Sequence, residues 1–569
     1  MSQENPSNPK KSKKILFISI GIALILAFCL CLAGAVAVTQ FTDIAPSLRL
    51  PWLSFLLGPS WDSSEVVPSE SDFYMVVNPN LQDMSNAKHL IDVYSAVLED
   101  TDLMKEIDDG LKEEYDISFT EDIRPWLGRE IAVTIPDLEA VANNDEPDMA
   151  VIVASTSQKE VDAFLDKLRN QLEADDYDIA VRMYEGVTYY AQVVNEEWET
   201  PLVFGKLKNF VVFATSDDIM KDIIDVSEGN TDSLSKNEKY KQLIDALPSD
   251  AAAIAFYDME NLASIVLENT GTGFVPPAQT VEQTEALKAV GIALSLTNEG
   301  IALDFAVTFN PDELQILEDS QPTAYGGALL DNIPADALGF IVSQDLDSIW
   351  QKYLVSIEEN PDVKQQLEDM GNQLGMTFDE ELLSWATGEY TLAIIETSTS
   401  DTYLPPLGVF SIFETSDQAQ AEDIMEGIVS LIQNFMYIEF YTEEINGVEM
   451  QVFQEGGVSL GYGFTPEHLV IGFTEDALSI SVSEDITPIS KDDTFQAVES
   501  YLPSRNSGYF YINIDSVWRL AYDNMGEYDR ETFDEFLPYL EPIKALGAAG
   551  QLANPQDGIG QATIFFYIP

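Results

Sequence analysis

An internal repeat constrains this chain more than any other feature of its sequence. Two long stretches, 65–310 and 328–569, match each other block by block in the same order. The offset between matched residues stays between 255 and 259, as in the pairs Trp126–Trp385, Glu130–Glu389 and Pro248–Pro503. So constant an offset over six blocks indicates a duplication. The sequence therefore predicts two tandem related units, 65–310 and 328–569, joined by a linker at 311–327.

The hydrophobic periodicity within each copy predicts both strands and helices. Runs such as EIAVTI at 130–135 and DMAVIVAS at 148–155 are rich in β-branched residues and are typical of strands. Residues 158–174 repeat apolar side chains at helical spacing, and 418–435 is their counterpart in the second copy. The predicted fold class is α+β, with two tandem related units, mostly antiparallel sheets and one preceding transmembrane helix.

The N-terminal part of the chain predicts a membrane anchor. Residues 15–39 carry no charge and no proline, and they follow a basic tail, 1–14, with four lysines among its last five residues. A helix of 25 residues spans roughly 37 Å, which is enough for a hydrocarbon core of about 30 Å. Lysines on this flank place the N-terminus in the cytoplasm. We therefore expect a single-pass cell-membrane protein that contacts the lipid bilayer through 15–39, with its C-terminal bulk extracytoplasmic.

A cleaved signal peptide is the alternative, because Ala35-Val36-Ala37 resembles a cleavage site. The apolar run is much longer than a usual signal-peptide core, which favours an uncleaved signal anchor. Cys29 and Cys31 both lie in this run and are the only cysteines. The extracytoplasmic part therefore has no disulfide, no thiolate metal site and no cysteine nucleophile.

Residues 40–64 form a juxtamembrane linker that is rich in proline and serine but also carries Trp52, Phe55 and Trp61. These aromatic side chains suit either the headgroup level of the membrane or packing against the folded part. The sequence leaves both interpretations open.

The blocks of the repeat resemble the bacterial extracytoplasmic proteins that carry the uncharacterised domain DUF3352. The resemblance rests on the proline-led opening strand, the Trp-x-x-x-Glu element at Trp126 and Trp385, the middle helix and the lysine–aromatic–Leu-Pro block. It covers most of 65–569. It implies an extracytoplasmic fold behind an N-terminal membrane segment, and it implies no activity, catalytic residue or cofactor.

The residues that most resemble a catalytic motif are Gly457-Val458-Ser459-Leu460-Gly461, which fit the G-x-S-x-G pattern of serine hydrolases. The flanking sequence indicates a hairpin instead of a strand-to-helix turn. His468 follows Ser459 with no aspartate between them, so the usual order of a triad fails. His89 and His468 are the only histidines and occupy non-equivalent places in the copies, which argues against a histidine metal site.

The chain has 98 acidic and 28 basic side chains, a net charge of −70, which excludes a nucleic-acid partner. Five acidic clusters would suit weak divalent-cation binding, but none fits the EF-hand spacing, so we interpret them as solvated surface. These clusters are Glu99/Asp100/Asp102, Asp108/Asp109, Asp145/Glu146/Asp148, Asp175/Asp176/Asp178 and Glu196/Glu197/Glu199. The acidity suits either salty surroundings or recognition of cationic or cell-envelope partners.

Trp126 and Trp385 recur at matched positions before strands, and core packing is the simplest reason for such a repeated aromatic. The sequence has no P-loop, no G-x-G-x-x-G after a strand, no HExxH and no CxxC. We therefore predict no catalytic, cofactor-binding or metal-binding residues. The function expected is a non-enzymatic binding or scaffolding module of the cell envelope, and the alternative is a carboxylate-based extracytoplasmic hydrolase.

Overall fold

The computed structural model describes most of the chain after residue 60. The described residues are 61–79, 87–98, 108–112, 116–138, 147–194, 200–259, 287–310, 324–358, 364–365, 367–368, 371, 382–397, 406–436, 438–455, 458–526, 530, 533–534, 536–552 and 558–569. The basic tail (1–14), the predicted anchor (15–39) and nearly all of the predicted linker (40–64) lie outside these residues. None of the described helices is both long enough and apolar enough to span a membrane.

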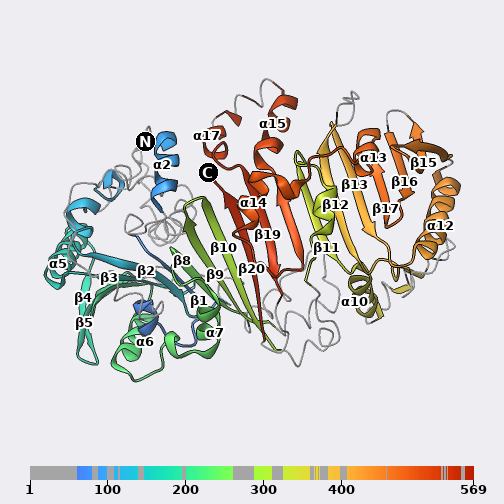
Figure 1. The fold of residues 1–569 in the computed structure, drawn as a ribbon. Helices are drawn as coiled ribbons and strands as arrows, with labels where there is room; N and C mark the ends of the chain where they lie inside the picture. The colour runs from blue at the N-terminus through green and yellow to red at the C-terminus, as the bar shows by residue number, and fades with distance from the viewer. Residues whose placement is uncertain are drawn as a thin grey trace, which may run out of the picture. The chain divides into compact units, whose positions relative to one another are not determined.

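The described residues group into two compact units, the first carrying β1–β9 and the second β10–β20 (Figure 1). The strands of unit 1 are β1 (Phe73–Val77), β2 (Leu127–Ile135), β3 (Ala150–Ser155), β4 (Ile179–Tyr184), β5 (Val187–Gln192), β6 (Val203–Leu207), β7 (Phe210–Ala214), β8 (Ala253–Asp258) and β9 (Leu287–Thr297). Its helices are α2 (Ala87–Leu98), α5 (Gln158–Ala174), α6 (Asp217–Glu228) and α7 (Glu238–Ala246), with the 3-10 turns η2 (Asp62–Glu65) and η5 (Leu234–Lys236) and the π turn η4 (Phe119–Ile123).

Unit 2 repeats this series of elements. Its strands are β10 (Gly300–Phe309), β11 (Gly339–Gln344), β12 (Glu389–Glu396), β13 (Leu407–Glu414), β14 (Tyr441–Ile445), β15 (Val448–Glu455), β16 (Val458–Phe464), β17 (His468–Phe473), β18 (Gly508–Ile512), β19 (Ala545–Gln551) and β20 (Ile559–Tyr567). Its helices are α10 (Leu346–Glu358), α12 (Gln418–Met436), α13 (Glu475–Ser481), α14 (Asp493–Glu499), α15 (Ile514–Asn524) and α17 (Leu537–Leu540), with the 3-10 turns η7 (Ala328–Asn332) and η8 (Ile489–Lys491).

Within each unit neighbouring strands pair antiparallel, and the two units share an order of strands. In unit 1 the order is β9–β8–β1–β2–β3–β7–β6–β5–β4. In unit 2 the matching run is β19–β18–β11–β12–β13–β17–β16–β15–β14, and β20 and β10 follow β19. The expectation of a mixed fold with mostly antiparallel strands is therefore confirmed. The predicted transmembrane helix is outside the described residues.

One strand does not follow the repeat boundary read from the sequence. Residues 300–309 lie in the first copy by sequence, yet as β10 they belong to unit 2 and pair along their length with β20. A strand at the end of a copy has backbone groups that can pair on either side, so sequence similarity does not decide every strand that it pairs with.

The helix predicted over 158–174 is α5, whose five apolar side chains at helical spacing are all buried. They pack with Met75 of β1 and Val133 of β2 on one face of the unit 1 sheet. Tyr74, the next residue in β1, points to the opposite face and contacts Tyr240 of α7. The two faces of this sheet are therefore covered by different helices.

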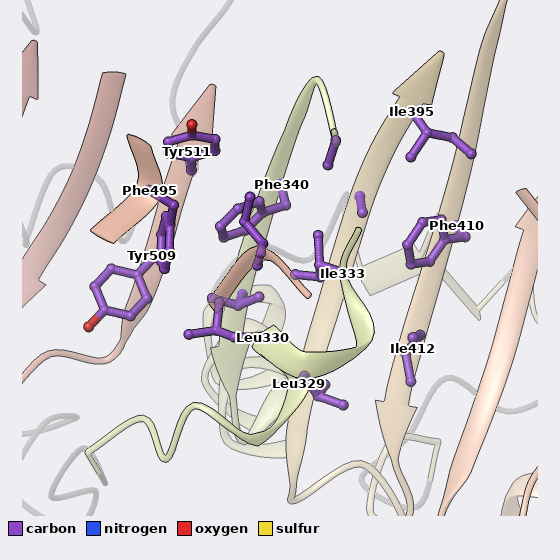
Figure 2. Packing of buried hydrophobic residues seen from close by; sticks show 14 of the residues in the cluster. Leu329, Leu330, Ile333, Phe340, Ile395, Phe410, Ile412, Phe495, Tyr509 and Tyr511 are labelled. Carbon is purple, nitrogen blue, oxygen red and sulfur yellow. The ribbon is translucent and has the colours of Figure 1, made fainter. Parts of the chain in front are cut away.

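The core of unit 2 is built in a similar way around an aromatic cluster. Phe340 of β11 stacks on Tyr511 of β18 at 5.2 Å, and Phe495 of α14 packs against both. Figure 2 shows these rings beside the apolar side chains of η7 and of neighbouring strands. By strand register and helix position, the three rings correspond to three aromatic residues of unit 1. Phe340, Phe495 and Tyr511 take the places of Tyr74, Tyr240 and Phe256, respectively. The packing is thus repeated, but the hydroxyl groups are not.

Candidate functional site: two buried glutamates

Two buried carboxylates occupy matched places in the two units. Glu130 lies in β2 and is 9% exposed, and Glu389 begins β12 and is 7% exposed. Each follows a buried tryptophan by four residues, which is the Trp-x-x-x-Glu element of the sequence. A buried carboxylate needs hydrogen-bond donors around it, so its partners show what it does.

Glu130 accepts hydrogen bonds from the start of η2. The backbone N–H groups of Asp62 and Ser63 donate at 3.0 and 2.8 Å, and the Ser63 hydroxyl donates at 2.7 Å. The first N–H groups of a helical turn have no partner within the turn, so the carboxylate caps η2 from across the fold. Ser63 is fully buried and its oxygen is 2.8 Å from the Tyr74 hydroxyl. Because the only hydroxyl proton of Ser63 is donated to Glu130, Tyr74 is the donor in that contact.

Glu389 makes the corresponding contact in unit 2. One of its oxygens accepts from the backbone N–H of Leu329, in η7, at 2.9 Å. The other oxygen lies against Gly326, where an added Cβ would come within 2.6 Å of it. The backbone N–H of Glu389 in turn donates to Glu414 at 2.9 Å. In both units, therefore, a glutamate fixes a helical turn: Glu130 of β2 holds η2, which precedes β1, and Glu389 of β12 holds η7, which precedes β11.

Burial is the main influence on the pKa values of Glu130, Tyr74 and Tyr325. Desolvation raises the pKa of Glu130 above its ordinary value, and the hydrogen bonds from Ser63 and Asp62 partly oppose this rise. Burial likewise raises the pKa of the Tyr74 hydroxyl well above its usual range. In unit 2 burial and the neighbouring Glu389 carboxylate raise the pKa of Tyr325. These hydroxyl groups therefore stay protonated and serve as neutral donors or acceptors.

The matched tryptophans are core residues. Trp126 is 1% exposed and Trp385 is 4% exposed, and each indole N–H donates to a backbone carbonyl of the preceding turn. Their own carbonyl groups accept backbone N–H bonds from Thr156 and Ser416. The structure thus supports the packing interpretation of these residues.

The G-x-S-x-G sequence is part of a hairpin. Ser459 lies in β16, is buried, and pairs with Gln454 of β15. Its carbonyl accepts from the Thr474 N–H at 2.8 Å. A nucleophile of this motif needs a sharp turn between strand and helix, and an internal strand position does not provide it.

The two histidines lie in separate units. His89 belongs to α2, and His468 begins β17, where its backbone N–H donates to the Thr465 hydroxyl at 3.1 Å. The described part of the chain contains no group of three or more His, Cys, Asp or Glu side chains that could hold a metal ion.

Two of the five acidic clusters lie wholly within the described residues: Asp108/Asp109 and Asp175/Asp176/Asp178, whose three side chains are all exposed. Asp108 is engaged with its neighbours. Hydrogen bonds from Lys112, Ser118 and Thr120 lower its pKa to about 2. The side chains of these clusters that can be placed are therefore solvated or paired, which agrees with the surface interpretation.

The Ser63–Tyr74 part of this network was not predicted from the sequence. Asp62, Ser63 and Ser64 stand at the end of the predicted linker, yet they form η2, and both serines are buried. Two adjacent serines before the first strand were the only signal, and serine is as common in linkers as in buried turns. The repeated Glu130 and Glu389 gave a clear signal of importance without showing the role.

Three comparisons bear on what this chain resembles. The family model described as "Protein of unknown function (DUF3352)" matches residues 23–568. No curated protein matches the chain.

Solved structures that resemble it include three crystal forms of TP0453. Form I is 12% identical over 44% of this chain and 80% of that chain, with a TM-score of 0.24. Form III is 10% identical over 43% and 79%, with a TM-score of 0.24, and form IV is 12% identical over 46% and 87%, with a TM-score of 0.23. These scores are too low to carry an argument.

Proposed function

Because the chain belongs to the DUF3352 family, whose description names no function, we propose a role for it from its own sequence and structure. It is a single-pass, membrane-anchored protein whose body lies outside the cytoplasm. The body consists of two copies of one α+β unit and acts as a non-enzymatic binding or scaffolding module of the cell envelope.

The observation that carries this proposal is the repeated glutamate cap. Glu130 and Glu389 are both buried and both hold a helical turn onto a sheet. A carboxylate whose oxygens accept backbone N–H groups stabilises the fold, and these contacts occupy the oxygens that a substrate would have to reach. The matched buried glutamates of the two copies therefore have a structural role. A partner would then bind the exposed surface of the body.

The anchor follows from residues 15–39, which contact the lipid bilayer in this proposal, and from the lysines that precede them. The net charge of −70 favours cationic or cell-envelope partners, with weak divalent-cation binding as a second contribution. The same negative charge repels the phosphate backbone of nucleic acids and so argues against a nucleic-acid partner.

Cell fractionation tests the anchor. The full chain should stay in the membrane pellet after a high-salt or carbonate wash, because burial of an apolar helix does not depend on ionic contacts. A variant that lacks residues 15–39 should move to the soluble fraction. If the shortened chain stays in the pellet, or the full chain is released by the wash, the proposed anchor is wrong.

The alternative, a carboxylate-based hydrolase, would begin with Glu130, because a raised pKa is what a general acid needs. The three hydrogen bonds from η2 occupy this carboxylate. Glu130→Gln should therefore lower the free energy of unfolding and leave any hydrolytic activity of the chain unchanged. A hydrolytic activity of the full chain that disappears in a folded Glu130→Gln variant would favour the alternative.

A further inference from the structure

The outer edge of the unit 1 sheet is open and apolar. Among the described strands, β4 pairs with β5 alone, so its other side has no partner strand (Figure 1). Val181 and Met183 of β4 are 63% and 74% exposed, the largest values among the large apolar side chains in the described part of the chain. An edge strand with exposed apolar side chains is a template for pairing with another chain.

The hairpin turn determines which backbone groups face outward. Tyr184 pairs with Val187 across a two-residue turn, Glu185-Gly186, whose φ angles are 46° and 82°. Further along the hairpin, the Val193 N–H donates to the Asp178 carbonyl at 2.8 Å. Because hydrogen-bonded pairs alternate along an antiparallel ladder, the even-numbered residues of β4 face β5. The N–H and C=O groups of Ile179, Val181 and Met183 therefore point away from the sheet.

The other face of β4 is fixed to α6. Arg182 forms an ion pair with Asp217 at 2.5 Å, and the Tyr184 hydroxyl donates to Asp225 at 2.9 Å. These contacts hold the edge in place. They also neutralise Arg182, the one charged side chain within the strand, which would otherwise oppose pairing.

The equivalent edge in unit 2, strand β14, carries a charged side chain that opposes pairing. β14 has the same hairpin geometry, with Ile445 opposite Val448 and a two-residue turn, Asn446-Gly447, at φ 50° and 84°. Counted from this turn, Thr442 and Glu444 stand where unit 1 has Val181 and Met183. A charged side chain at an outward-facing position is a common way to prevent edge pairing, so the two copies differ in their capacity to associate.

We propose that β4 pairs antiparallel with β4 of a second copy of this chain, about a twofold axis at Val181. In this register Val181 lies opposite the partner's Val181, and Met183 lies opposite the partner's Ile179. Every outward-facing group of these three residues then has a hydrogen-bond partner, and the exposed apolar side chains contact one another.

The charges also suit this register. Arg182 lies opposite the partner's Ala180, and Asp178 lies opposite the partner's Tyr184, so no like charges are directly opposed. This self-complementarity favours a second copy over a foreign peptide. The net charge of −70 on each copy opposes association at long range, so the dimer should tighten as salt is added.

Disulfide trapping tests the register on the full chain, with Cys29 and Cys31 replaced by serine. Val181→Cys should form a disulfide-linked dimer, because opposite Cα atoms of a hydrogen-bonded pair lie about 5.5 Å apart, within disulfide range. Met183→Cys should not, because two copies of this residue would lie about 13 Å apart along the strands. Efficient linkage through Met183→Cys instead of Val181→Cys, linkage of Val181→Cys to a different protein, or no linkage at all would overturn the proposal.

A substitution copied from the second unit separates pairing from folding. The double variant Val181→Thr, Met183→Glu gives β4 the outward-facing residues of β14, which that hairpin already accommodates. We expect the full chain to sediment as a dimer and the double variant as a monomer with an unchanged circular dichroism spectrum. The matched control, Glu443→Gln in β14, should remain dimeric. A monomeric unmodified chain at high salt, or a double variant that stays dimeric, would contradict the proposed interface.

Discussion

At the scale of single residues, both copies use a buried glutamate to hold a helical turn, but the groups that donate hydrogen bonds to it differ. Glu130 binds η2 through three donors, one of them the Ser63 hydroxyl, whereas Glu389 accepts from one N–H of η7 and lies against Gly326. A carboxylate has room for about four donors, so it can hold a turn with different sets of partners.

Removing Glu130 should destabilise the protein strongly. Glu130→Ala would leave the buried Ser63 N–H and hydroxyl and the partly buried Asp62 N–H without this acceptor, at a cost of about 3 kcal/mol or more. Urea unfolding of the full chain measures this loss, and Glu70→Ala at an exposed turn is the control, for which we expect less than about 0.5 kcal/mol. Equal losses in the two variants would show that the cap has no special role.

The pH dependence of Glu130 has a definite sign. Burial raises its pKa in the folded protein, so the ionised carboxylate lowers the free energy of unfolding at neutral pH. That penalty disappears as the pH falls through the raised pKa toward the ordinary value of 4.5. The stability of the unmodified protein relative to Glu130→Gln should therefore increase as the pH is lowered from neutral toward 4.5. A difference that stays constant, or decreases, would contradict the assignment.

Removing a hydroxyl group from the aromatic cluster of unit 1 and adding one at the matched position in unit 2 tests whether the two clusters differ. Tyr74→Phe removes the donor to Ser63 and should cost about 1 kcal/mol. Phe340→Tyr adds a hydroxyl to a cluster in which the buried Tyr511 hydroxyl has no partner among the described residues, and it should cost about 2 kcal/mol. Unfolding free energies of both variants measure this asymmetry. If Phe340→Tyr is the milder change, the two sites do not differ as described.

At the scale of elements, close approach between η7 and β12 depends on a glycine. Gly326→Ala would place a methyl group 2.6 Å from a Glu389 oxygen, so we expect a loss of about 1–3 kcal/mol as the carboxylate moves from the turn. Gly427→Ala in α12 is a matched control, because nothing lies within 4 Å of its added Cβ. The control should be neutral or stabilising by up to about 1 kcal/mol. Similar losses in both variants would show that Gly326 is not needed for this contact.

The sequence predicted where helices and strands form better than it predicted which strands pair and which side chains cap a turn. The spacing of Val161, Phe164 and Leu168 predicted α5, and all three are buried. The pairing of β10 with β20 was not predicted, because a strand pattern does not specify which sheet edge it joins. The cap on η2 was missed for a related reason: Asp62 and Glu130 are 68 residues apart, and periodicity reports only local structure.

At the scale of the whole molecule, the acidic charge should make stability depend on salt. A net charge of −70 repels itself in the compact state, and screening reduces this repulsion. Thermal melts should therefore shift upward from low to high NaCl. Millimolar Ca²⁺ should add nothing beyond a NaCl solution of the same ionic strength, and an additional upward shift would instead show specific calcium binding.

Single-cysteine labelling tests most directly the proposal that a membrane segment holds the duplicated body outside the cytoplasm. Cys29 and Cys31 are first replaced by serine, and one cysteine is then introduced at Ser7 in the basic tail, at Thr231 in unit 1 or at Ser504 in unit 2. On intact cells, a membrane-impermeant maleimide should label Thr231→Cys and Ser504→Cys, both exposed positions, and should reach Ser7→Cys only after the membrane is opened. Labelling of Ser7→Cys on intact cells while both body positions stay unlabelled would contradict the account.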